Sequence, residues 1–214
     1  RWTPSIEPMR PRDSPAGGWG CRRPGTSASV TSGTGTTATP ATSHPAYAAA
    51  APDWFWSEDD PRAPFGSDAG HDTLSALHEH FREGGSDAHV PGCVASLIED
   101  WRLVPEEIWD SSQAEIVAWL DADDDHVGFL HAEVNAYIAA ACGQFKTSGW
   151  IHPALRFWAE RALMLLEHVL APWGQKAFGS PPDHYADKLS ATRAVIQAAP
   201  EPPKRMQLRM YRRR

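Results

Sequence analysis

Apolar side chains recur every three or four residues along the central part of the chain. The first such run spans residues 74–81 and is followed by two glycines. Because an α-helix turns once in 3.6 residues, this spacing gathers the apolar side chains on one helical face. We therefore predict a helix that begins with Asp72 as its N-cap and stops at the glycine pair.

The same spacing predicts five further helices. The second follows Pro91, the third opens at the capping box Ser112-x-x-Glu115, the fourth follows the acidic run 121–125, the fifth begins at Pro153, and the last spans residues 183–198. No stretch alternates apolar and polar residues as a half-buried strand does. The sequence therefore predicts an all-α fold, a compact bundle of about six helices.

The two ends of the chain differ from this helical region in composition. Residues 1–43 are rich in Ser, Thr, Gly, Pro and Arg and hold almost no large aliphatic side chains, which predicts disorder. The chain begins with Arg rather than Met, which is consistent with a fragment or with an extension outside the native product. Residues 200–214 form a basic tail to which the same interpretations apply. Between them we expect one folded, acidic domain, residues 44–199.

Charge is distributed unevenly along the chain. By residue count the net charge is about +3 for residues 1–50, about −15 for residues 51–200 and about +5 for residues 201–214. A surface this acidic attracts a basic protein and speeds its association. The candidates for that contact are Glu106, Glu107, Asp121, Asp123, Asp124 and Asp125. The alternative is that the charge only keeps the domain soluble.

Cysteine usage and hydropathy bear on the compartment. The three cysteines are widely spaced and form no C-x-x-C pair, which fits a reducing compartment and gives no thiolate metal site. We expect Cys142 to pack in the core of an apolar helix. The longest apolar stretch, residues 162–170, is too short to span a bilayer. These features predict a soluble cytoplasmic protein that does not enter a membrane.

Three short motifs occur in a fixed order: His-Pro at 44–45, Trp-Phe-Trp at 54–56 and Ala-Pro-Phe-Gly-Ser-Asp at 63–68. Together they resemble the N-terminal part of the YfeS-like bacterial proteins. A later stretch, GQFKTSGWIHPAL at 143–155, is similar to a glycine-containing turn and the helix after it in that family. The resemblance covers residues 44–170 and implies a folded unit of that extent, but no activity. The basic C-terminal tail departs from the family.

The segment APFGSDAGHD, residues 63–72, is the densest cluster of candidate chemistry. In one interpretation its glycines shape a turn, Asp68 or Asp72 caps the helix, and Phe65 fills the core. In the other, Asp68 and His71 bind a metal, or His71 and Asp72 act as acid and base. The candidate residues of a ligand pocket are Trp54, Trp56, Phe65 and Asp68.

Other signatures of chemistry are absent from the sequence. It holds no nucleophile elbow, no Walker loop and no dinucleotide fingerprint, so we predict no cofactor. The Arg-rich tail and its Tyr211 favour contact with nucleic acid, but the acidic body repels a phosphate backbone. We therefore do not expect a nucleic-acid partner.

Two functional hypotheses follow. The first is a non-enzymatic interaction or regulatory module, for example of the immunity type, whose acidic face binds a basic protein. The second is a metal-dependent or acid–base enzyme centred on Asp68, His71 and Asp72. We favour the first, because no complete catalytic motif is present.

Overall fold

The computed structural model describes residues 38–178 and 185–203. Every regular element in these ranges is helical, which confirms the all-α prediction. The longer helices are α2 (Asp68–Arg82), α3 (Val90–Trp101), α5 (Gln113–Leu120), α6 (His126–Ser148), α7 (Pro153–Leu165), α8 (Ala171–Phe178) and α9 (Tyr185–Ala198). The shorter ones are η1 (Pro40–Thr42), α1 (Pro45–Ala50), η2 (Asp53–Trp56), η3 (Asp87–His89), α4 (Glu106–Asp110) and the π-helical η4 (Leu166–Leu170).

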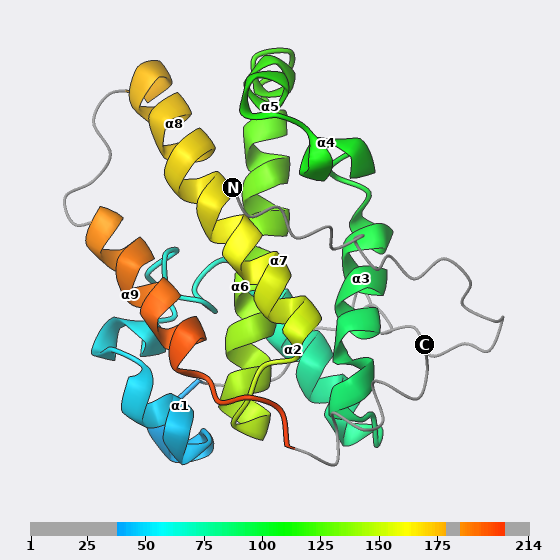
Figure 1. Cartoon of the computed structure of the whole chain (residues 1–214), viewed down its shortest axis with the longest axis vertical. Helices are drawn as coiled ribbons and strands as arrows, with labels where there is room; N and C mark the ends of the chain where they lie inside the picture. The colour runs from blue at the N-terminus through cyan, green and yellow to red at the C-terminus, as the bar shows by residue number, and fades with distance from the viewer. Residues whose placement is uncertain (1–37, 179–184, 204–214) are drawn as a thin grey trace, which may run out of the picture.

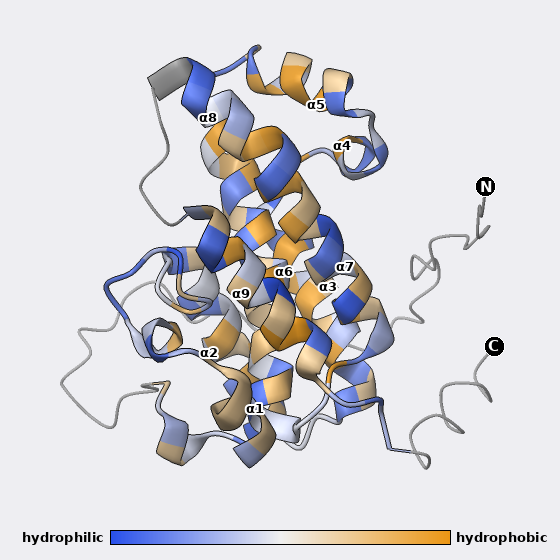
Figure 2. Ribbon diagram, turned by 60° about the vertical axis from the view of Figure 1, so that its left-hand side comes forward, coloured by the Kyte–Doolittle hydropathy of each residue, from blue (hydrophilic) through white to orange (hydrophobic). Residues whose placement is uncertain are grey.

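Helix α6 forms the centre of the fold (Figure 1). It packs chiefly against α2 and α7, and also against α3 and α9. Its apolar side chains, among them Leu130, Val134 and Ile138, are buried, as is Cys142, which confirms that this cysteine belongs to the core. In Figure 2 the hydrophobic residues lie mainly along α6 and on the inner sides of the helices around it. Burial of this shared apolar surface is the main stabilising term of such a bundle.

The predicted fifth helix is longer than its apolar stripe suggested. Helices α7, η4 and α8 follow one another without a break and form one rod that crosses the front of Figure 1. Pro172 lies inside this rod and has no backbone N–H to donate to the carbonyl of His168. The side chain of Gln113 donates to that carbonyl instead, at 2.7 Å. Counting the rod once, the described residues hold six helices of seven or more residues.

The start of α2 corrects the sequence prediction. The side-chain oxygen of Ser67 accepts a hydrogen bond from the backbone N–H of Gly70 at 3.1 Å, so Ser67 is the N-cap, not Asp68 or Asp72. The prediction began the helix at its first apolar repeat. A first turn that carries little apolar surface leaves no such signal, and the cap therefore lies one turn earlier.

The APFGSD block is a tight turn against the chain that precedes it. A Cβ atom on Gly66 would lie 2.0 Å from the carbonyl oxygen of Asp60, and one on Gly70 would lie 2.4 Å from that of Pro64. Only glycine permits these close approaches. Phe65, directly before Gly66, is buried in the core, as the first interpretation of this segment predicted.

The structure also tests the predicted starts of two helices and the predicted limits of the folded region. The Ser112–Glu115 capping box is present, and Pro153 opens α7. The ordered region begins before residue 44, because Ala38 is buried and the Thr42 carbonyl accepts a hydrogen bond from Lys146 at 3.3 Å. Our predictions for residues 1–37 and 204–214 lie outside the described residues. Within the described ranges, no helix has the length and hydropathy that crossing a membrane requires.

Candidate functional site

The proposed acid–imidazole cluster lies on the surface. Asp68, His71 and Asp72 all occupy exposed positions in the first two turns of α2, where their spacing puts them on one helical face. Across the described part of the chain, no three His, Cys, Asp or Glu side chains are grouped so as to hold a metal ion. The enzyme hypothesis stays a prediction.

Trp54 and Trp56, which were predicted to line the same pocket, have ring contacts with α1 and α9. Trp56 contacts Tyr47 edge-on, with ring centroids 5.6 Å apart. The ring of Trp54 lies beneath the ammonium group of Lys188 from α9, at 4.8 Å. Both rings pack against the hydrophobic core, together with the buried Phe65. Trp54 and Trp56 therefore join η2 to α9 and to α1.

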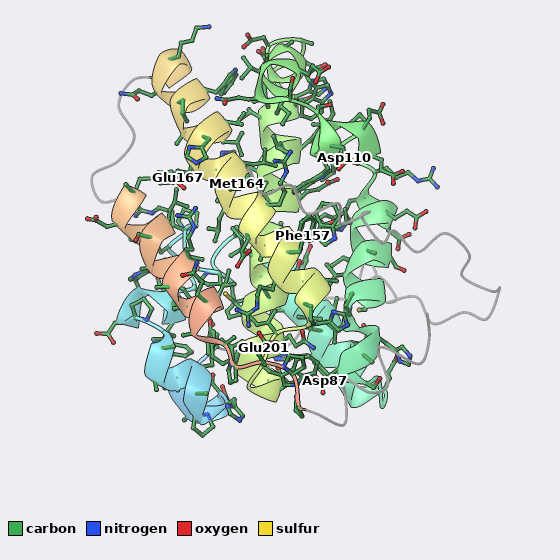
Figure 3. All side chains as sticks on the ribbon, in the orientation of Figure 1. Asp87, Asp110, Phe157, Met164, Glu167 and Glu201 are labelled. Atoms are coloured by element: carbon green, nitrogen blue, oxygen red, sulfur yellow. The ribbon has the colours of Figure 1, made fainter. Side chains whose placement is uncertain are left out.

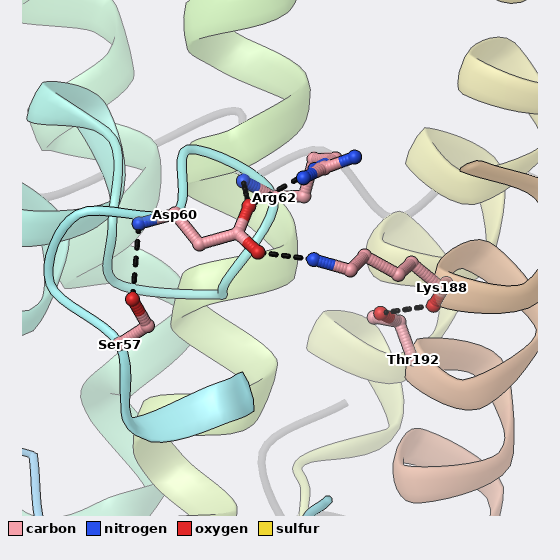
Figure 4. A network of polar contacts seen from close by, with 5 residues as sticks. All are labelled: Ser57, Asp60, Arg62, Lys188 and Thr192. Carbon is pink, nitrogen blue, oxygen red and sulfur yellow. Dashed lines mark hydrogen bonds and ion pairs between the residues drawn. The ribbon is translucent and has the colours of Figure 1, made fainter. Parts of the chain in front are cut away.

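Lys188 belongs to a polar network centred on Asp60 (Figure 4). The carboxylate of Asp60 accepts hydrogen bonds from the ammonium of Lys188, from the side chain of Arg62 at 2.9 Å and from the backbone N–H of Arg62 at 3.0 Å. Burial acts to raise the pKa of Asp60, but these hydrogen bonds outweigh it and hold the pKa at about 2. The network ties α9 to the turn that precedes α2.

The six acidic candidates for partner binding separate into two groups. Asp121, Asp123, Asp124 and Asp125 lie in the connection from α5 to α6, where Asp121 accepts a hydrogen bond from the indole N–H of Trp173 at 2.8 Å. Glu106 and Glu107 open α4 and line a groove on another part of the surface.

This acidic groove has a volume of about 1160 Å³ and is open to solvent. It lies where the end of α3, the α3–α4 connection, α4, the start of α5, α6 and α7 meet. Its lining residues are Ala95, Ile98, Glu99, Arg102, Leu103, Val104, Pro105, Glu106, Glu107, Trp109, Asp110, Ser111, Glu115, Glu133, Tyr137 and Trp158. Figure 3 labels Asp110 on α4 and, beside the groove on α7, Phe157. The lining set holds six carboxylates and one guanidinium group, that of Arg102.

Three aromatic rings form one wall of the groove, and we call Trp109, Tyr137 and Trp158 the aromatic trio. The ring centroids of Trp109 and Tyr137 are 5.0 Å apart and nearly perpendicular, while those of Tyr137 and Trp158 are 5.4 Å apart and stacked. Arg161 of α7 donates to the Trp109 carbonyl at 2.9 Å, which fixes α4 against α7. The wall is therefore pre-organised by contacts within the protein.

Glu133 of α6 contributes a buried carboxylate to the groove. Only 2% of this residue is exposed. One oxygen accepts from the backbone N–H of Val104 at 3.0 Å, and the other accepts from the indole N–H of Trp109 at 2.8 Å. Burial raises the pKa of Glu133, and these two hydrogen bonds oppose that shift. Both donors are neutral, and no Lys, Arg or His of the described ranges forms an ion pair with this carboxylate.

The other buried polar residues of α6 have partners that join segments of the fold. Gln144 donates to Asp87 and accepts from the backbone N–H of His152 at 2.7 Å. Lys146 donates to the Thr42 carbonyl, and burial lowers its pKa. Glu133 differs from these two residues because it lines an open groove.

The sequence analysis did not identify Glu133 or the aromatic trio. A signal was present: Glu133 lies three residues after Leu130 and four before Tyr137, so a charged residue interrupts the apolar face of a central helix. The three rings come from α4, α6 and α7, and no local pattern predicts that they meet. Comparison with protein-family models, with curated proteins and with solved structures finds no match for this chain.

Proposed function

We propose that this protein is a non-enzymatic interaction module that binds a basic protein through the acidic groove. The observation that carries the proposal is the lining of the groove, which contains six carboxylates and three aromatic rings but a single arginine. Such a surface attracts a cationic partner over long range and offers large apolar contact area at short range. An immunity-type protein that neutralises a basic partner is one form of this function.

The surface next to the groove favours a protein partner over a small molecule. Phe157 is 50% exposed and its ring contacts that of Trp158 at a centroid distance of 5.2 Å. Met164, two turns further along α7, is 44% exposed. Exposed aromatic and methionine side chains are enriched where proteins bind one another. The exposed apolar side chains of α7 therefore add to the acidic groove an apolar surface of the kind found in protein–protein interfaces.

The test compares two sets of three carboxylates that carry the same charge. One variant neutralises the groove with Glu106→Gln, Glu107→Gln and Asp110→Asn. The matched control neutralises the α5–α6 connection with Asp123→Asn, Asp124→Asn and Asp125→Asn. The probe is an acetylated peptide amide in which four arginines alternate with alanine, and calorimetry measures its dissociation constant at about 50 mM and about 300 mM salt.

The groove variant should lose about tenfold or more in affinity, and the control variant should lose less than about threefold. Wild-type affinity should fall at the higher salt concentration, since exposed charges are screened. Equal losses in the two variants would assign the attraction to overall charge. An absence of binding to the wild-type protein would overturn the proposed function.

A further inference from the structure

We infer that the acidic groove receives an arginine side chain of the partner, which contacts the aromatic trio and pairs with the carboxylate of Glu133. This inference rests on the proposed function and specifies the chemistry of the residue that the groove recognises. Two features of the groove support it, the state of the Glu133 carboxylate and the aromatic wall beside it, and the backbone conformation at Arg102 helps to shape the site.

The carboxylate of Glu133 has unused capacity to accept hydrogen bonds. An ionised carboxylate offers about four acceptor positions, and the N–H groups of Val104 and Trp109 occupy one on each oxygen. A buried charge is stable only when it is paired or fully hydrogen-bonded. A cationic side chain in the groove supplies the missing charge, and its two N–H groups can reach both oxygens when the cation is a guanidinium.

The aromatic wall favours guanidinium over ammonium. A guanidinium group is planar and weakly hydrated, so it stacks on a ring and gives up its water readily, whereas the ammonium of lysine is compact and strongly hydrated. The groove offers Trp158 and Tyr137, both partly exposed, beside a carboxylate that is almost fully buried. A cation that reaches Glu133 must lose most of its water. Arginine is therefore the residue that this combination of rings and carboxylate selects.

Arg102 shows how the chain builds this site. It is the only non-glycine residue of the described ranges with a positive φ, 51°, and it ends α3 in the left-handed conformation. That turn leads into the connection whose Val104 N–H holds Glu133. A left-handed arginine is less stable than glycine at such a position. The lining of the groove thus includes a residue in a strained backbone conformation, and this residue carries the one positive charge of the lining.

The test uses the arginine–alanine peptide and a counterpart in which every arginine is lysine. Both are titrated into the full chain by calorimetry, and the indole N–H signals are followed by NMR. The site variants are Glu133→Gln and Trp158→Leu. Their matched controls are Glu167→Gln, at an exposed position of η4, and Trp119→Leu, whose ring stacks on that of His126 outside the groove lining. Thermal unfolding checks that each variant is folded.

We expect the arginine peptide to bind the wild-type protein about tenfold more tightly than the lysine peptide. Each site variant should reduce this preference to about twofold or less while the affinity for the lysine peptide changes little, and the controls should preserve the preference. Arg102→Gly should tighten the binding of both peptides, because it removes the cation that repels them. The indole signal of Trp109 should shift on binding of the arginine peptide.

Three results would contradict the inference, and they differ in what they leave standing. Equal affinity for the two peptides, lost in the groove-neutralised variant, would overturn arginine recognition and leave the proposed function intact. An arginine preference that survives both site variants would place recognition outside Glu133 and Trp158. If neither peptide binds the wild-type protein, the proposed function and the inference both fail.

Discussion

Two carboxylates of this protein, Asp60 and Glu133, are surrounded in opposite ways. Asp60 lies between two cations, Lys188 and Arg62, and these contacts hold its pKa at about 2. Glu133 is more deeply buried, meets two neutral donors, and has a raised pKa. Only the first carboxylate has its charge balanced within the described part of the protein.

The difference indicates which of the two regions is structural and which is available for binding. The Asp60 network joins α9 to the turn before α2, and the charge of Asp60 is already paired within the protein (Figure 4). The Glu133 carboxylate lines an open groove and lacks a counter-charge. Buried charges without a partner cost free energy, and they are tolerated where binding supplies the partner. Each prediction below changes one side of this contrast.

The largest effect is expected when Asp60 is removed. Asp60→Ala should lower the free energy of unfolding by about 2–3 kcal/mol, because it strands a mostly buried ammonium and deletes the link between α9 and the turn. Urea denaturation followed by circular dichroism measures this change. Asp59→Ala is the matched control, since Asp59 is an exposed neighbour, and it should alter stability by less than about 0.5 kcal/mol. Equal effects would contradict a structural role for Asp60.

The Asp60 network should also make stability depend on acid. The folded pKa of about 2 lies below the ordinary value of 3.8, so this stabilisation is complete above pH 4 and is lost as the pH falls toward 2. The loss amounts to about 2 kcal/mol at most. Denaturation curves between pH 5 and pH 2 should therefore show a steeper fall for the wild-type protein than for Asp60→Asn. Parallel falls would show that other carboxylates dominate.

Glu133→Gln should change stability less, and with the opposite dependence on pH. The substitution removes a buried charge but leaves one of two hydrogen-bond acceptors, so the net change at pH 7 should lie within about 1 kcal/mol. A raised folded pKa means that the native state holds its proton longer than the unfolded state. Wild-type stability should thus fall, relative to Glu133→Gln, as the pH rises from 4.5 through the folded pKa.

The same denaturation series shows whether the folded protein stabilises the protonated or the ionised form of Glu133. A wild-type protein that gains stability over this pH range, relative to the variant, would mean that the carboxylate is stabilised inside the groove without a partner. That result would remove the contrast with Asp60. Addition of the arginine peptide should reverse the pH dependence, since a bound cation favours the ionised carboxylate.

Features of the fold that depend on neighbouring residues could be predicted from the sequence, whereas features that depend on distant residues could not. Helical spacing and the Ser112 capping box are local, and they gave the all-α fold and most helix positions. The cap at Ser67 was not predicted because a polar first turn leaves no apolar repeat. The continuation of the rod through Pro172 was not predicted because a proline usually marks the end of a helix. Local sequence patterns therefore predicted most of the fold.

The site depends on contacts between distant segments, which a single sequence does not reveal. Glu133 meets the backbone of Val104, 29 residues away, and the ring of Trp109, 24 residues away. The sequence analysis named acidic residues as candidates for contact with a basic partner, and two of them, Glu106 and Glu107, line the groove. The run 121–125, the densest in the sequence, lies outside the lining of the groove, because charge density along a chain does not say which charges converge in space.

The smallest effect concerns a second ion pair of α9, between Arg193 and Glu167 of η4. Its chemistry matches that of Lys188 and Asp60, but its side chains are 31% and 42% exposed, compared with 20% and 17%. Water screens an exposed pair and ordering two long side chains costs entropy, so Glu167→Gln should lower stability by less than about 0.5 kcal/mol. Urea denaturation in parallel with Asp60→Ala measures the difference. A comparable loss of stability in both variants would mean that any ion pair that holds α9 contributes equally. Burial would then not distinguish the Asp60 pair, and the contrast between Asp60 and Glu133 would lose its physical basis.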